Sequence, residues 1–227
     1  MSVAIQVKQT IDNAFQGILS AHQAVDQKTI EHEFVVGKLT HTLALAVGAT
    51  AEDADAIEIA ARVHDIGKIA VPPQILNKNA SLTEDEFALV KEHPLVGGKI
   101  LSIGNHPTFK LAHDIALQHH ERFDGTGYPY GLKGDEISFA ARVTALCDIY
   151  DALRSSRSYK KQKSHEEAAK IITEGDSRVM PTMFDPQVLD AFKHIHKTLQ
   201  VVYDGACRSE VKTLYGNVAL LDQPPPA

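Results

Sequence analysis

The sequence has 227 residues, of which 44% are hydrophobic and 23% are charged, a composition typical of a globular domain with a sizeable core. Its formal net charge of -6 argues against a protein that binds nucleic acid polymers through a basic face. No apolar stretch approaches the roughly 18 residues that span a membrane, and the first residues lack the apolar segment of a signal peptide. Two cysteines are too few for a disulfide framework. We therefore expect a cytoplasmic protein without membrane attachment.

Apolar residues recur at helical spacing in the first part of the chain and predict three helices. The first covers Val3–Leu19, where we expect a packing or dimerisation helix, and the second covers Thr29–Val47. The third begins after Thr50, a residue type that caps helix N-termini, and ends near Gly67.

Capping signals and a proline place the next helices. Thr83 and Glu86 have the spacing of a capping box, and Pro94 after His93 predicts a break or a fresh first turn. A further helix covers Lys110–His120, so its two adjacent histidines lie at its end. Neighbouring side chains, which point about 100° apart within a helix, converge most easily there.

One loop and three helices are predicted for the second half of the chain. Residues 122–131 are dense in Gly and Pro, which predicts a well-defined loop whose backbone can approach a ligand. Helices are expected over Ile137–Leu153, over residues 164–172 and from Pro186 onward. Alternating residues within Val201–Leu221 predict a short C-terminal β-hairpin before a Pro-rich end.

The chemistry of the chain centres on His64 and Asp65, which stand side by side in an apolar run, with Lys68 following. On a continuous helix, His64 and Lys68 would face one cleft. A lone pair of this kind is usually a buried, hydrogen-bonded structural feature. Further imidazoles and a carboxylate in helical contexts argue otherwise, because together they form the ligand set of Zn, Fe, Mn or Ni. The further candidates are His32, His93, His119, His120 and Asp148. The pattern indicates a dinuclear metal hydrolase, with no metal role for His41 or His106.

These motifs, in this order, resemble the HD-GYP subgroup of the HD phosphohydrolase superfamily. The matching segments are His64-Asp65-Ile-Gly-Lys68, His93-Pro94, His119-His120-Glu121, Asp124-Gly-Thr-Gly127-Tyr128-Pro129, Asp148-x-x-Asp151, Arg157-x-Tyr159-Lys160 and Phe184-Asp185-Pro186. The resemblance implies an all-α fold, an HD-domain helical bundle. It places the catalytic domain at residues 28–200, between a helical extension at 1–27 and a C-terminal extension at 201–227.

The same resemblance implies a metal-dependent phosphodiesterase that hydrolyses the bacterial messenger cyclic di-GMP to pGpG, to GMP or to both. Two divalent ions, Fe or Mn before Ni or Zn, would activate a bridging hydroxide. Asp65 would bridge the ions and, with Lys68, is expected to be catalytic, the lysine by holding the scissile phosphate. The first ion would be held by His32, His64, Asp65 and Asp148. The second would be held by Asp65, His93, His119 and His120.

Substrate contacts follow from the resemblance as well. Gly127 and Tyr128 would line the guanine or ribose side. Arg157 and Lys160 would contact the phosphates, and Asp151 would orient these basic residues or the substrate.

Two positions depart from the family pattern. Some members carry a glutamate four residues before the first histidine, where it helps to hold a third metal, but this chain has Lys28 there. An arginine common three residues after that histidine is Val35. Because of Lys28 we expect two metals rather than three, whereas Val35 bears on local packing or substrate contacts.

Two other functions compete with the phosphodiesterase. One is a binding or adaptor module that keeps metal and nucleotide affinity but has little turnover. The other is an HD phosphohydrolase for a linear dinucleotide or a different cyclic dinucleotide. Family members typically carry a sensory domain, for which this chain has no room. Regulation is thus expected from a protein partner such as a diguanylate cyclase, from homodimerisation, or not at all.

Overall fold

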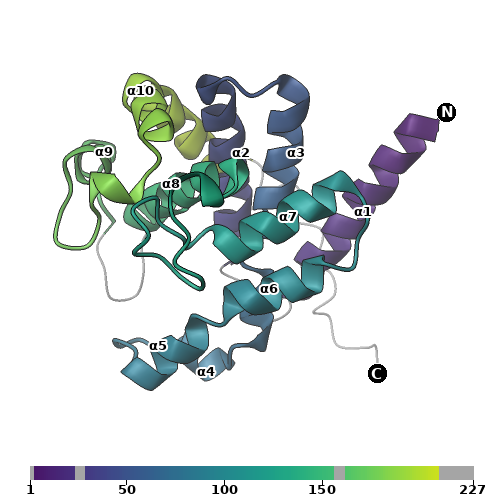
Figure 1. Cartoon of the computed structure of the whole chain (residues 1–227), viewed down its shortest axis with the longest axis horizontal. Helices are drawn as coiled ribbons and strands as arrows, with labels where there is room; N and C mark the ends of the chain where they lie inside the picture. The colour runs from purple at the N-terminus through teal and green to yellow at the C-terminus, as the bar shows by residue number, and fades with distance from the viewer. Residues whose placement is uncertain (1–2, 24–28, 156–161, 210–227) are drawn as a thin grey trace, which may run out of the picture.

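The computed structural model describes residues 3–23, 29–155 and 162–209, and within these ranges every regular element is a helix (Figure 1). This confirms the predicted all-α class for the described part of the chain. The α-helices are α1 (Val3–Gln23), α2 (Thr29–Val47), α3 (Ala51–Ala61), α4 (Pro73–Leu76), α5 (Glu84–Val90), α6 (His93–Leu101), α7 (Pro107–Gln118), α8 (Phe139–Arg154), α9 (His165–Glu174) and α10 (Pro186–Ser209). Three 3-10 turns complete them: η1 (Ile66–Ala70), η2 (Gly134–Glu136) and η3 (Pro181–Met183).

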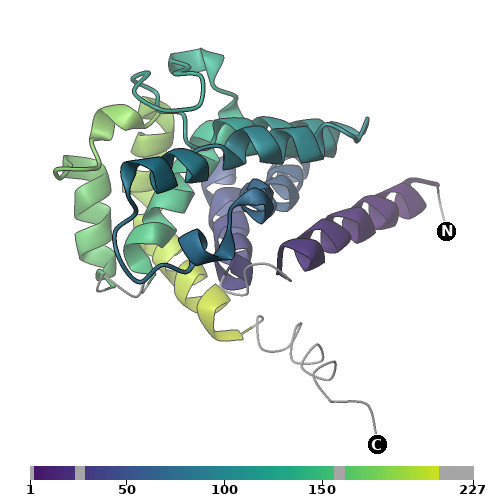
Figure 2. The ribbon, with the colours of Figure 1, turned by 90° about the horizontal axis from the view of Figure 1, so that it is seen from below.

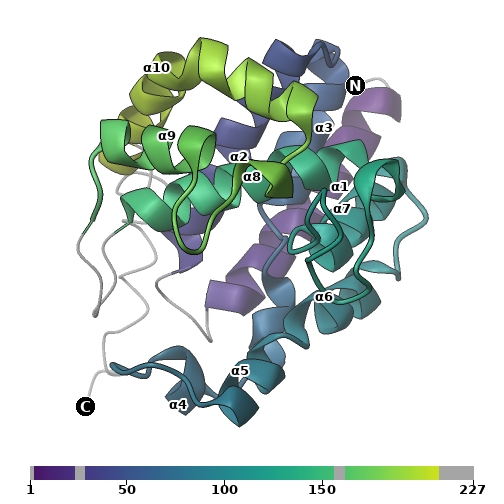
Figure 3. The same ribbon diagram turned by 60° about the vertical axis from the view of Figure 1, so that its left-hand side comes forward.

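Helix α2 is the central element of the core. It packs against α3, α8 and α10, and its residues Val36, Leu39 and Leu43 are completely buried. Helix α9 covers α8 and α10 on one side, while α6 and α7 pair on the other (Figure 3). This arrangement brings the start of α2 and the ends of α3 and α7 to the same interior region.

Helix α1 joins the core through its second half. Phe15, Leu19 and His22 are buried there, and the helix contacts both α2 and η1. Its N-terminal end projects past the other helices (Figures 1 and 2). The predicted N-terminal extension therefore includes a helix that packs directly on the elements carrying His32 and Lys68.

Most local predictions agree with the structure. Helix α2 has the predicted bounds, and Thr83 forms a capping box with Glu86 as expected. A second capping box joins Ser164 to Glu167 at the start of α9. Among the described residues, no helix combines the length and apolarity that crossing a bilayer requires.

The end of α3 differs from the prediction, because the helix stops at Ala61 instead of continuing to Gly67. The following residues form tight turns, and Asp65 has φ -95° and ψ 4°, in the sparsely populated bridge region. Gly67 packs so closely on the backbone of His93 that a Cβ atom would overlap its carbonyl oxygen. The chain thus leaves the helix so that η1 can lie against the start of α6.

The C-terminal part also differs from the prediction. Residues 201–209 continue α10 as one uninterrupted helix across the predicted boundary at residue 200, so no hairpin begins at Val201. The alternating residues that predicted the hairpin, Val211, Thr213 and Tyr215, lie outside the described residues.

Candidate metal centre

The seven predicted ligands come from five places in the fold and meet in two groups. The first group contains Asp65, His93, His119 and His120, and the second contains His32, His64 and Asp148. Within each group, one potential ligand atom per residue lies within 4.8 Å of the others. Most of these side chains are buried, so their polar atoms depend on one another or on a bound ion rather than on solvent.

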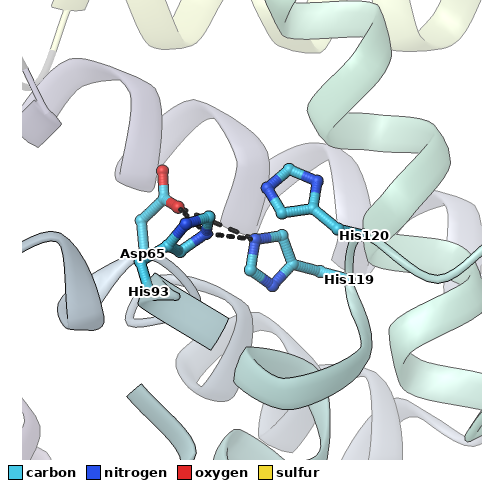
Figure 4. Close-up of side chains that lie close together, drawn as sticks. All are labelled: Asp65, His93, His119 and His120. Carbon is cyan, nitrogen blue, oxygen red and sulfur yellow. Dashed lines mark hydrogen bonds and ion pairs between the residues drawn. The ribbon is translucent and has the colours of Figure 1, made fainter. Parts of the chain in front are cut away.

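The first group gathers around the end of α7 (Figure 4). His119 is the C-cap of α7 and His120 follows it, while His93 is the first residue of α6. Asp65 approaches from the turn after α3, with its Oδ1 atom 3.2 Å from His93 Nε2 and 3.7 Å from His119 Nε2. The adjacent histidines converge because α7 ends at Gln118, directly before them.

The hydrogen bonds of this group leave acceptor atoms facing each other. His93 Nδ1 lies 2.6 Å from the carbonyl of Val90, and His119 Nδ1 lies 3.0 Å from that of Ala116. A carbonyl only accepts, so each Nδ1 carries a proton, and in a neutral ring the Nε2 atom then bears a lone pair. Burial lowers the pKa of His93, which favours the neutral ring.

The facing lone pairs are a specific sign of a cation site. His93 Nε2 and His119 Nε2 lie 3.2 Å apart, and the buried Asp65 Oδ1 has no hydrogen-bond partner among the described residues. Two nitrogens bound to one ion at about 2.1 Å, in neighbouring coordination positions, would be about 3.0–3.4 Å apart. The residues present therefore fit a divalent transition metal.

The second group lies where α2, α8 and the turn after α3 meet. His64 donates from Nδ1 to the carbonyl of Ala61 at 2.7 Å, and burial lowers its pKa to about 3, which leaves Nε2 free. That Nε2 atom lies 3.3 Å from His32 Nε2. Asp148 Oδ1 lies 3.5 Å from the same His32 nitrogen.

The surroundings of the second group stabilise positive charge. Burial lowers the pKa of His32, but hydrogen bonds to Asp151 and Asp65 outweigh this effect and raise it to about 10. Burial likewise raises the pKa of Asp148, yet the imidazoles of His32 and His64 hold it below its usual value. A site that retains a proton this strongly is also suited to a metal cation.

Asp65 connects the two groups through its two carboxylate oxygens. Oδ1 faces His93 and His119, whereas Oδ2 lies 3.6 Å from His32 Nε2 and 3.5 Å from His64 Nε2. Burial raises its pKa, but the ammonium of Lys68 and the surrounding imidazoles hold the pKa well below the usual range. The carboxylate is thus ionised and placed to bridge two ions.

Lys68 lies at the same site, but on a different structural element from the one predicted. It lies in η1 rather than on a helix shared with His64, and its Nζ atom contacts Asp65 Oδ2. Its side chain is 24% exposed, whereas that of Asp65 is 3% exposed. The ammonium group therefore lies between the buried Asp65 carboxylate and solvent, where an anion can approach it.

The loop predicted over residues 122–131 forms one wall of the first group. The ring of Tyr128 stacks on that of His120, with centroids 4.7 Å apart. A Cβ atom on Gly127 would overlap the backbone of Glu121 and Arg122, so the close approach of the loop requires glycine. Tyr128 thus lies beside the first group, and the expected contacts of Gly127 and Tyr128 with a base or ribose stay a prediction.

Glu121, for which the sequence suggested no role, fastens this loop. Its carboxylate is buried and accepts from the backbone N–H of Tyr130 at 2.7 Å and from that of Leu132 at 3.0 Å. The only indication of this role in the sequence is the position of Glu121, directly after His119-His120 and before the Gly/Pro-rich segment.

Replacing Glu121 with glutamine is expected to lower the free energy of unfolding by about 1.5–3 kcal/mol, the range for hydrogen bonds to charged groups. The amide would turn a donor toward one of the two backbone N–H groups. Urea unfolding measures the effect. The matched control is Glu136→Gln, since exposed Glu136 accepts from the N–H of Lys133 and should change stability by less than about 0.5 kcal/mol. Equal effects of the two variants would contradict the assigned role of Glu121.

Asp151, expected to orient basic residues or the substrate, has a buried carboxylate that lies 2.7 Å from His32 Nδ1, because α8 turns it toward α2. The expected role of Asp151 stays a prediction. Arg157 and Lys160, the predicted phosphate contacts, and Lys28 lie outside the described residues.

Three further predictions concern residues outside the centre. His41 pairs with Asp55 near the surface, and His106 caps α7 by accepting from the backbone of Thr108, so neither joins the ligand groups. Val35, which replaces the family arginine, is buried in the core. It therefore packs against apolar neighbours.

The sequence model of the HD domain matches residues 13–188. A cyclic di-GMP phosphodiesterase from Thermotoga maritima is 40% identical over 178 residues, covering 78% of this chain and 47% of that protein. A 3'3'-cGAMP-specific phosphodiesterase 2 from Vibrio cholerae is 34% identical over 160 residues, covering 70% of this chain and 31% of that protein. The chain thus spans less than half the length of these relatives.

Solved structures share the fold. Bd1817, described as a HDG"Y"P protein from Bdellovibrio bacteriovorus, superposes with a TM-score of 0.59 at 22% identity, covering 84% of this chain and 62% of that chain. The match to the domain model extends over most of the chain, and the histidines and aspartates of the motifs converge in space. The chain therefore belongs to the HD domain family, within its HD-GYP subgroup.

Proposed function

We propose that this protein is a metal-dependent phosphodiesterase that hydrolyses cyclic di-GMP through a dinuclear metal centre. The observation that carries the proposal is the position of Asp65, whose two oxygens face two separate groups of ligand atoms. A shared carboxylate between two nitrogen-rich groups is an arrangement suited to two-metal hydrolysis of a phosphodiester. The names of relatives at 38–40% identity support cyclic di-GMP as the substrate.

The chain would hold one ion in each ligand group. His32, His64 and Asp148 would hold the first ion, His93, His119 and His120 would hold the second, and Asp65 would offer one carboxylate oxygen to each group. The mixed imidazole and carboxylate donors favour Fe or Mn and also accept Ni or Zn. We propose two ions rather than three, because Lys28 stands where a glutamate would help to hold another. When bound, the ions supply a hydroxide at neutral pH and offset the charge of the phosphate.

The remaining residues position the substrate. Lys68, whose side chain is 24% exposed beside Asp65, binds a non-bridging oxygen of the scissile phosphate and stabilises the charge that develops there. Tyr128, stacked on His120, and the backbone of Gly127 line the side where a base or ribose lies. Arg157 and Lys160 are proposed to bind the second phosphate, on the strength of the family motif alone.

The test is a turnover assay on anaerobically purified protein reconstituted with Fe(II) or Mn(II). Cyclic di-GMP and 3'3'-cGAMP are compared at equal concentration, and chromatography of the products distinguishes pGpG from GMP. We expect two metals per chain and a kcat/KM at least about tenfold higher for cyclic di-GMP. Such a ratio corresponds to roughly 1.4 kcal/mol of transition-state discrimination.

Two outcomes would overturn parts of this proposal. A preference for 3'3'-cGAMP, the substrate named for relatives at 31–37% identity, would reassign the substrate within the same chemistry. Binding of two metals and of cyclic di-GMP without hydrolysis would favour the nucleotide-binding module over the enzyme.

A further inference from the structure

We propose that Tyr203 of α10, acting through Ser155 and Asp151, is a positioning residue for the metal ligand His32. The C-terminal part of α10 would then belong to the metal centre, although Tyr203 lies beyond the matched residues 13–188 and beyond the boundary predicted at residue 200. The inference rests on the proposed metal-dependent function, which it deepens.

A chain of three contacts joins Tyr203 to His32. Asp151 Oδ2 lies 2.7 Å from His32 Nδ1 and also accepts from the hydroxyl of Ser155 at 3.1 Å. The same Ser155 oxygen lies 3.4 Å from the hydroxyl of Tyr203. All four side chains are buried or half-buried, which shields the contacts from bulk water.

The chemistry of the groups fixes the direction of each hydrogen bond. An ionised carboxylate only accepts, so both Ser155 and His32 Nδ1 donate to Asp151. The serine has a single proton, so Tyr203 donates in the remaining contact. The resulting order runs from Tyr203 through Ser155 to Asp151, with His32 donating to Asp151 from the other side. With Nδ1 donating to Asp151, a neutral His32 ring has its lone pair on Nε2, and this atom faces His64 and Asp148. This tautomer is the one that binds a metal through Nε2.

The ring of Tyr203 is held so that its hydroxyl cannot turn away. Tyr203 is only 5% exposed, the guanidinium of Arg154 lies 4.6 Å from its ring centroid, and the ring of Tyr150 packs against it edge-on at 5.7 Å. Arg154 in turn donates to Asp204, the next residue of α10, at 3.1 Å. The packing of α8 against α10 thus orients the Tyr203 hydroxyl toward Ser155.

A second contact ties the same end of α10 to α2. Cys207 lies beside Glu31, the residue directly before His32, and burial together with that carboxylate raises the pKa of the thiol to about 11. Helix α10 packs extensively along α2, and its C-terminal end lies near the start of α2 (Figure 2). The segment therefore contacts α2 directly before His32 and also reaches the His32 ring through Ser155 and Asp151.

The test measures the affinity of each metal site rather than turnover. Mn(II) binding is followed by competition with a chromophoric chelator and by electron paramagnetic resonance of the bound ions. In Tyr203→Phe, which keeps the ring but removes the hydroxyl, one of the two Mn(II) ions should bind about tenfold more weakly, the lower end of the range for loss of an outer partner. The other ion should bind as in the wild type.

A matched control and a double mutant separate positioning from packing. Tyr150→Phe removes another buried hydroxyl, which contacts His165 and Arg154 but not Ser155, so both Mn(II) affinities should stay at wild-type values. Ser155→Ala should reproduce the effect of Tyr203→Phe, and combining the two should add little, because both break the same chain.

The outcomes keep this inference distinct from the proposed function. The inference is wrong, while the function stands, if the wild type binds two ions and Tyr203→Phe binds both with wild-type affinity. The same conclusion follows if Tyr150→Phe weakens Mn(II) binding as much as Tyr203→Phe does. If two ions bind but cyclic di-GMP is not hydrolysed, the function fails, and the affinities still decide the role of Tyr203. If the wild type binds no ion at all, both fail.

Discussion

Replacing Asp65 with asparagine is expected to remove both metal ions and to reduce cyclic di-GMP hydrolysis by at least about a thousandfold. The reason is that each carboxylate oxygen faces a different ligand group, so one substitution affects both. Asparagine keeps the volume but offers a single neutral oxygen, and its amide nitrogen would point a donor at one of the ions.

The loss of metal can be measured without turnover. A ligand present at about 100 times its Kd stabilises a protein by about 2.7 kcal/mol per site, which appears as a rise in Tm. We expect this Mn(II)-dependent rise in the wild type and its absence in Asp65→Asn. Elemental analysis after reconstitution gives the stoichiometry directly.

The matched control for this substitution is Asp55→Asn. Asp55 also pairs with a histidine, its Oδ1 lying 3.1 Å from His41 Nε2, but the pair is near the surface and outside the ligand groups. It should retain two metals and full activity. An Asp65→Asn protein that keeps one tightly bound ion would show that the carboxylate belongs to a single site and would exclude the bridge.

The sequence was most informative where local physics determines the structure. The bounds of α2 and the capping box of Thr83 and Glu86 follow from periodicity and from side chains that satisfy the first N–H groups of a helix. The ligands could be chosen because buried histidines and aspartates in apolar helices require a partner. All seven meet in the structure because each is carried by an element that packs on the same core.

The sequence was least informative where contacts between distant residues determine the structure. The early end of α3 follows from the packing of Gly67 on His93, which no local pattern around residue 61 reveals. The partner of Asp151 is His32 on another helix, so spacing along α8 could not identify it. Tyr203 lies past the motifs altogether, and only the fold brings it near the centre.

Replacing Lys68 with methionine is expected to leave both metals in place but to lower kcat by about a hundredfold or more. An ammonium group only donates, so Lys68 cannot be a ligand, and removing its positive charge next to Asp65 should slightly favour cation binding. The lost rate reflects the loss of a charged donor aimed at the phosphate. Inhibition by inorganic phosphate should weaken in parallel, since the same contact holds that anion.

Lys78→Met provides the matched control for Lys68. Lys78 also binds a carboxylate, with Nζ 2.6 Å from Glu86 Oε2, and its side chain has a similar exposure of 30%, but it lies outside the metal centre. It should keep wild-type kcat, metal content and phosphate inhibition. If Lys68→Met instead lost an ion, the lysine would act by holding Asp65 in its bridging position. If Lys68→Met were fully active, the scissile phosphate would be bound without Lys68. The positive charge would then stabilise the Asp65 carboxylate in the folded protein and would have no part in the reaction.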